Sequence, residues 1–167
     1  YYYFYPNTFI KYALENDFVF LTRTFSKLFS LAGCRLGYVV GKAEGIAMIQ
    51  KLCTPHNVNA FGIKFAQTIL ETDGMLEQLV KKQLEGKQFL TDALLENGYE
   101  INVKEGNFLF IKPKTDANRV VQKMKEEKRI LIKAYKGIGN FGECLRVSTG
   151  EKKVMKKFVQ ALLEIDQ

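Results

Sequence analysis

Histidine and cysteine are scarce in this chain, and their scarcity bears on metal binding. The 167 residues include a single histidine, His56, and three cysteines, Cys34, Cys53 and Cys144. The three cysteines share no metal-ligand spacing, and one histidine cannot complete a zinc site. The sequence therefore predicts no metal centre, reduced cysteines of a cytosolic protein, and a surface role for His56 rather than a role as catalytic base.

Long apolar runs, internal repeats and low-complexity segments are also missing. No run approaches the roughly 18 apolar residues of a membrane-spanning helix, so we expect no membrane span. With 47% hydrophobic and 26% charged residues, the composition is that of a globular protein with its own core. The opening residues, 1–5, lack a methionine, a signal peptide or a helix cap, and we expect them to continue from a longer polypeptide.

Positive charge predominates, with a formal net charge of +7 and a pI near 9.2. A basic balance can indicate nucleic-acid binding, but no aromatic and basic stripe or known module accompanies it. The lysines instead stand in short groups on expected helices that also carry glutamates, which is typical of solvated helix faces. We therefore expect no nucleic-acid partner, and a positive field that favours small anionic ligands.

The most informative segment covers residues 24–38, T-F-S-K-L-F-S-L-A-G-C-R-L-G-Y, and directly follows an apolar run. It places Lys27 among hydroxyl side chains, with Arg35 eight residues later. A lysine amine shielded from water at the end of a strand can attack a carbonyl and form a Schiff base. Hydroxyls and a guanidinium supply directional donors to a phosphate dianion. The alternative is a surface Ser-Lys loop followed by a buried strand.

This segment resembles the cofactor-lysine motif of the pyridoxal-phosphate aminotransferases of fold type I, and most closely the wording T-x-S-K-x-x-x-L-A-G-x-R-x-G of the histidinol-phosphate aminotransferase branch. The resemblance implies pyridoxal 5'-phosphate as cofactor, Lys27 as its covalent anchor and proton shuttle, and Thr24, Ser26 and Arg35 around its phosphate. Tyr1 is the positional candidate for the tyrosine that reaches the ring hydroxyl. In the family, the aspartate for the pyridine nitrogen, a phosphate-binding loop and a ring-stacking residue precede this region, so we expect the isolated chain to be inactive.

Arg146 stands inside an otherwise apolar expected strand, where an unpaired charge is costly. From the residues alone, a structural salt bridge and a bound anion are equally good explanations. Its segment, C-L-R-V-S-T-G, resembles the family's L-R-[IV]-[ST]-x-G, whose arginine grips the acidic group of the substrate. Gly106, Asn107 and Phe108 resemble a G-N-F element whose asparagine lies near the substrate, although asparagine is also common as a turn residue.

Two further segments bear on the choice of ligand. Residues 137–142 fit G-x-G-x-x-G, but a strand rather than a helix is expected to follow, so we interpret them as a hairpin loop and not as a dinucleotide site. Histidinol-phosphate aminotransferases generally carry an arginine where this chain has Lys133. Because a lysine lacks the planar guanidinium fork, this change bears on phosphate recognition.

The periodicities predict helices over residues 8–15, 41–52, 60–71, 73–97, 118–128 and 150–165, and strands over 18–22, 35–40, 99–103, 107–111, 130–134 and 144–148. The first two strands are of the continuous apolar, parallel-sheet type. With the resemblance, the fold class is α/β: the C-terminal part of an aspartate aminotransferase-like large domain over 1–56 and a small α+β domain over 57–167.

The function that the resemblance implies is transamination of an amino acid or amino-alcohol phosphate, with a keto acid as second substrate and a homodimer as the usual assembly. Two alternatives stay open. One is a threonine-phosphate decarboxylase-like enzyme that shares the lysine and the arginine but breaks a different bond. The other is a non-catalytic aminotransferase-like module of a larger fused protein.

Overall fold

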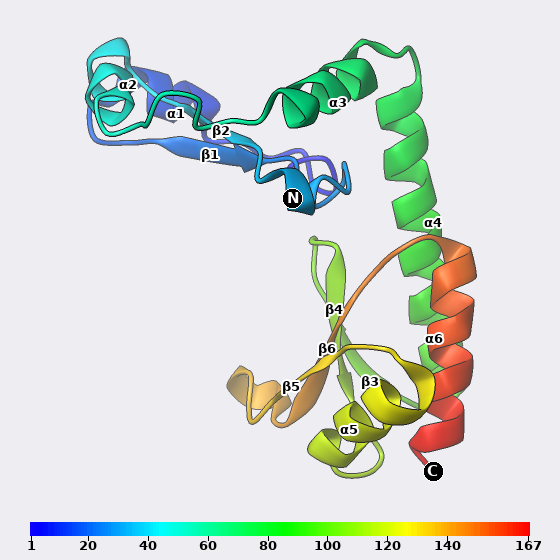
Figure 1. Ribbon diagram of the computed structural model, residues 1–167. Helices are drawn as coiled ribbons and strands as arrows, with labels where there is room; N and C mark the ends of the chain where they lie inside the picture. Colours follow the sequence, from blue (N-terminus) through cyan, green and yellow to red (C-terminus); the bar gives the residue numbers. More distant parts are fainter. The chain divides into compact units, whose positions relative to one another are not determined.

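The computed structural model describes all residues, 1–167, and divides into two compact units, Tyr1–Leu79 and Val80–Gln167 (Figure 1). This division falls within the long helix α4 (Met75–Glu96). The boundary after residue 56 that the family resemblance implies is a different division, and it stays a prediction. None of the helices combines the length and the apolar composition needed to cross a bilayer.

The first unit contains two strands, a short 3-10 turn and three helices. Its elements are α1 (Ile10–Glu15), β1 (Leu21–Thr24), η1 (Ala32–Cys34), β2 (Gly37–Val40), α2 (Ala43–Gln50) and α3 (Ala60–Glu71). The strands pair antiparallel, from Leu21 opposite Val40 to Thr24 opposite Gly37. The helices over 8–15, 41–52 and 60–71 are confirmed, with ends that shift by a few residues.

The expectation of buried strands of the parallel type was wrong for this unit. The strand predicted over 18–22 begins only at Leu21, and Phe18 is 94% exposed. The apolar residue Phe20 packs against Gly41 and Gly45 at the start of α2, where an added Cβ would lie 2.9 and 2.8 Å from its ring. The apolar run thus belongs to a loop that packs against a helix. Composition alone does not distinguish such a loop from a buried strand.

The second unit has a four-stranded antiparallel sheet in the order β3-β4-β6-β5. Its elements after α4 are β3 (Glu100–Val103), β4 (Phe108–Lys112), α5 (Ala117–Lys128), β5 (Lys133–Tyr135), η2 (Gly139–Phe141), β6 (Cys144–Ser148) and α6 (Lys152–Ile165). The strand predicted over 130–134 starts three residues late. The reason lies at the end of α5, where Arg129 adopts the left-handed conformation with φ 55° and the Ile130 amide bonds back to Met124.

The hydrophobic core lies between one face of this sheet and the helices α4, α5 and α6, which pack against that face. The register places Leu109 and Ile111 of β4 beside Val147 and Leu145 of β6, all four essentially buried. The helices contribute Leu90, Leu94, Val120, Met124, Phe158 and Leu162. Each fully buried side chain of this size stabilises the fold by about 1.5–3 kcal/mol relative to its exposed state. Because side chains alternate along a strand, residues such as Phe110 and Arg146 lie on the opposite face.

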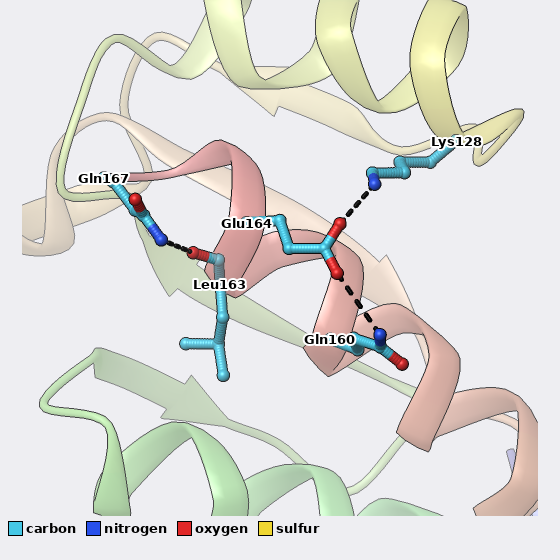
Figure 2. A network of polar contacts seen from close by, with 5 residues as sticks. All are labelled: Lys128, Gln160, Leu163, Glu164 and Gln167. Atoms are coloured by element: carbon cyan, nitrogen blue, oxygen red, sulfur yellow. Dashed lines mark hydrogen bonds and ion pairs between the residues drawn. The ribbon is translucent and has the colours of Figure 1, made fainter.

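Polar contacts fix the helices around this core. Lys128 of α5 donates to Glu164 of α6, which also accepts from Gln160 one turn earlier, at 3.2 Å (Figure 2). The buried carboxylate of Asp166 accepts hydrogen bonds from the amides of Lys114 and Thr115, both at 2.9 Å. These contacts hold the β4–α5 connection against the end of α6.

Candidate active site

A pocket of about 290 Å³ in the first unit gathers three of the predicted cofactor residues. Tyr1, Thr24 and Lys27 all line it, at the point where β1 ends. Arg23, Phe29 and Tyr38 contribute to the same walls. The strand–loop–strand order therefore places the lysine at a strand terminus, as expected from the sequence.

Hydroxyl groups organise the loop that carries Lys27. The Thr24 hydroxyl donates to the Ser26 hydroxyl at 2.9 Å and accepts from the Ser26 amide at 3.1 Å. This local turn, in which a hydroxyl takes the place of a backbone acceptor, fixes the direction of the chain before the lysine. After it, Leu28 and Phe29 are buried and anchor the loop. Lys27 itself is exposed, so the residues of this chain do not shield its amine.

Arg35 does not line this pocket. It adopts the left-handed conformation with φ 53°, and its guanidinium donates to the carbonyl of Ala32 at 3.1 Å. The preceding turn is held by Asn59, whose amide group donates to the carbonyl of Cys34 at 2.7 Å. The structure thus brings Tyr1, Thr24, Ser26 and Lys27 together, and turns Arg35 toward its own backbone.

The sequence interpretation missed Arg23. Its guanidinium lies 4.0 Å from the centre of the Tyr2 ring and donates to the Thr8 hydroxyl at 2.8 Å. It thereby ties β1 to the segment that carries Tyr1. Half-buried and exposed residues alternate along β1, which places Arg23 on the same face as Leu21. An arginine two residues after an apolar strand residue could therefore have indicated a half-buried, functional side chain.

The pocket also has an aromatic wall. The ring of Tyr3 packs edge-on against Phe29, with 5.4 Å between centres, and burial raises the pKa of the Tyr3 hydroxyl. The same pocket is also lined by the hydroxyl of Thr24 and the ammonium of Lys27. Such a donor set fits an anionic aromatic aldehyde, which is the chemical description of pyridoxal phosphate.

In the second unit, Arg146 forms no ion pair, so the salt-bridge alternative is not realised in this chain. Its guanidinium lies over the ring of Phe108, 4.1 Å from the centre. In the sheet it stands between Phe110 of β4 and Lys133 of β5. Lys133 is exposed, with its ammonium 5.1 Å from the centre of the Tyr135 ring. A half-buried guanidinium beside a second cation leaves this face suited to an anion.

Asn107 directly precedes β4, as predicted, and is half-buried. Its carbonyl accepts a hydrogen bond from the Thr149 amide at 2.8 Å, which joins it to the chain just beyond β6. The loop at 137–142 is closed by a bond from the Ile138 amide to the Gly142 carbonyl, and β6 follows it. A strand rather than a helix therefore follows the glycines, and the loop joins the antiparallel pair β5 and β6, which confirms the predicted hairpin loop.

Comparison with known proteins places these features in a family. The model of the aminotransferase class I and II family matches residues 5–162. The histidinol-phosphate aminotransferase of Citrifermentans bemidjiense is 33% identical over 150 residues, which make up 89% of this chain and 42% of that protein. That of Thermotoga maritima is 28% identical over 153 residues, or 91% of this chain and 44% of that protein.

Among solved structures, the histidinol-phosphate aminotransferase of Sinorhizobium meliloti in complex with pyridoxal-5'-phosphate has a TM-score of 0.82 at 23% identity, over 93% of this chain and 43% of that one. This likeness supports the predicted fold class, an α/β portion of a fold type I enzyme. The chain spans less than half the length of the curated relatives it matches. Enzymes of this class use pyridoxal phosphate, in agreement with the expected cofactor. The chain belongs to the aminotransferase class I and II family.

Proposed function

We propose that this chain supplies the C-terminal portion of a pyridoxal-phosphate-dependent aminotransferase, whose large domain ends near residue 56 and whose small domain covers 57–167. The observation that carries the proposal is the pocket at the end of β1, where Lys27 stands with Thr24 and Tyr1. The rest of the active site comes from polypeptide outside these 167 residues, and we expect the enzyme to act as a homodimer.

When bound, pyridoxal phosphate supplies an aldehyde and an electron-withdrawing ring. Lys27 would hold this aldehyde covalently until the amino donor displaces it, and its freed amine would then carry a proton between the substrate carbon and the cofactor carbon. The hydroxyls of Thr24 and Ser26 and the guanidinium of Arg35 would hold the cofactor phosphate, and the Tyr1 hydroxyl would support the ring.

The substrate contacts come from the second unit. Arg146 binds the acidic group of the amino donor, and Asn107 lies beside the same molecule. We propose histidinol phosphate as amino donor and a 2-oxo acid as acceptor, because the relatives that match over most of this chain carry the name of that activity. Lys133 supports an anionic donor as a point charge, which binds phosphate with less geometric selectivity than an arginine would.

The test uses the full-length natural polypeptide that contains these residues. It is incubated with pyridoxal phosphate, reduced with borohydride and mapped by mass spectrometry. We expect the cofactor mass on Lys27 and its loss in K27R, while K51M, which removes an exposed lysine of the same unit, keeps it. An unmodified Lys27 in a folded protein would overturn the proposal and favour the non-catalytic module.

Product analysis then identifies the reaction. With histidinol phosphate and 2-oxoglutarate, we expect glutamate to accumulate in step with consumption of the donor. Release of carbon dioxide from an amino-acid phosphate, without formation of glutamate, would instead identify the decarboxylase-like alternative.

A further inference from the structure

Two consecutive residues of α4, Gly86 and Lys87, contact the two connections that carry the proposed substrate residues. Gly86 is buried against the turn after β6: a Cβ at this position would lie 1.8 Å from the Gly150 carbonyl oxygen and 2.9 Å from its carbon. Because these are backbone atoms, no side-chain movement can relieve the overlap. The absence of a side chain thus allows α4 to touch the main chain that follows Arg146.

Lys87 contacts the other connection. Its ammonium donates to the carbonyls of Lys104 and Gly106, the latter at 3.0 Å, and these residues form the turn that leads into Asn107. Desolvation lowers the pKa of Lys87, and the nearby Glu105 carboxylate acts in the opposite direction. Neighbouring lysines of the same helix instead approach carboxylates, Lys81 that of Glu85. Lys87 therefore directs its charge to the backbone of one turn.

The two connections are also joined to each other. The Thr149 amide donates to the Asn107 carbonyl at 2.8 Å, one step beyond the last ladder pair, Phe108 with Ser148. A shift of the 104–107 turn would consequently pull on the chain that follows Arg146. The position of α4 thereby sets the positions of both segments at once.

We propose that Lys87 is a positioning residue for the amino donor, acting through the 104–107 turn on Asn107 and, through Thr149, on the strand of Arg146. Lys87 touches neither cofactor nor donor in this role. Gly86 keeps the helix close enough for the ammonium to reach both carbonyls. The inference rests on the proposed function, because it holds only if Asn107 and Arg146 bind the amino donor.

The test compares K87M, K87R and the control K81M in the full-length natural polypeptide. For K87M we expect KM for the amino donor to rise about tenfold with kcat within about threefold, which is the pattern of lost binding without lost chemistry. K87R keeps donors for both carbonyls, so its KM should return to within about threefold of wild type. K81M should match wild type, and the absorbance of the bound cofactor should be the same in all variants.

Hydrogen exchange supplies a readout that needs no activity. The Thr149 amide should exchange about tenfold faster in K87M than in wild type, while core amides such as that of Leu145 are unchanged. An active wild type together with an unchanged KM in K87M would overturn the positioning role alone. A wild-type protein that does not turn over the donor would overturn the proposed function. In that case, unaltered hydrogen exchange at the Thr149 amide in K87M would overturn the positioning role as well.

Discussion

The guanidinium of Arg146 lies over the ring of Phe108, 4.1 Å from its centre, on the face of the sheet opposite the core. A cation–π contact of this kind stabilises a protein by about 0.5–1 kcal/mol where the two groups stay in contact with solvent, and both residues here are only half-buried. Arg146→Gln should therefore cost little stability. If Arg146 binds the acidic group of the donor, the same change should raise KM at least tenfold, since it removes a charge-assisted hydrogen bond.

The matched control for Arg146 is Arg119→Gln on α5, which should leave both KM and stability near wild type. Urea denaturation and steady-state kinetics on the same preparations separate the two effects. A loss of more than about 2 kcal/mol in R146Q with unchanged KM would show that the arginine serves the fold instead.

The helix cap at Asn59 gives a second prediction. Its side-chain oxygen accepts from the Gly62 amide at 2.6 Å, and its amide group donates to the Cys34 carbonyl at 2.7 Å. Asn59→Ala should cost about 1–2 kcal/mol, because it removes the cap of α3. Asn59→Asp keeps the cap and loses only the donor to Cys34.

Hydrogen exchange at the Gly62 amide distinguishes these two roles of Asn59. It should accelerate in N59A and stay slow in N59D. In both variants the turn that precedes Arg35 should exchange faster than in wild type. Equal exchange at Gly62 in all three proteins would contradict the capping role.

Gly86 gives a third prediction. Gly86→Ala would place a methyl group 1.8 Å from the Gly150 carbonyl oxygen, so α4 and the β6–α6 turn must separate. We expect a loss of about 3 kcal/mol or more, at the upper end for overpacked sites. Gly137→Ala is the control, because nothing lies within 4 Å of its added Cβ, and thermal denaturation should find it close to wild type. Equal melting temperatures for the two variants would contradict the close approach.

The fourth prediction concerns alkaline pH. The Tyr99 hydroxyl is buried near the Asp166 carboxylate. Burial raises the pKa of this hydroxyl, and the charge of Asp166 adds to the effect. The folded state thus disfavours the tyrosinate, so the free energy of unfolding is unaffected by this group below its unfolded pKa of about 10 and falls as the pH rises above it. Tyr99→Phe should remove that decline, because phenylalanine has no group that ionises.

Urea denaturation of Y99F and wild type at pH values from 7 to about 11 checks this prediction, with Tyr12→Phe as an exposed control. The difference in the free energy of unfolding between Y99F and wild type should grow as the pH rises above about 10, and Y12F controls for the loss of an exposed tyrosine hydroxyl. Parallel curves for Y99F and wild type would contradict it.

The sequence predicted the second unit better than the first. Along β6, the apolar residues Leu145 and Val147 alternate with Arg146 and Ser148, and this period of two follows from burial on one face only. In the first unit, Phe18 and Phe20 make an apolar run that reads as a buried strand. Their environment depends on contacts distant in sequence, such as Gly41 and Gly45 against Phe20, which no local pattern encodes.

The candidate site divides in a similar way. Thr24, Ser26 and Lys27 are close in sequence, so their grouping at the end of β1 could be predicted from the motif. Arg23 and Lys87 could not be singled out, because their significance depends on the partners that the fold brings to them, a tyrosine ring for one and two carbonyls for the other. The left-handed conformation of Arg35 is equally invisible in the residue type.

The strand order β3-β4-β6-β5 has a consequence for the kinetics of folding. The β3–β4 and β5–β6 hairpins each close through neighbours in sequence, whereas the β4–β6 pairing brings together strands that α5 and β5 separate in the chain. Such non-local pairing is the slow part of forming a sheet. The strand of Arg146, β6, therefore joins the two hairpins into one sheet. We expect its amides to gain protection from hydrogen exchange in the last cooperative step of refolding.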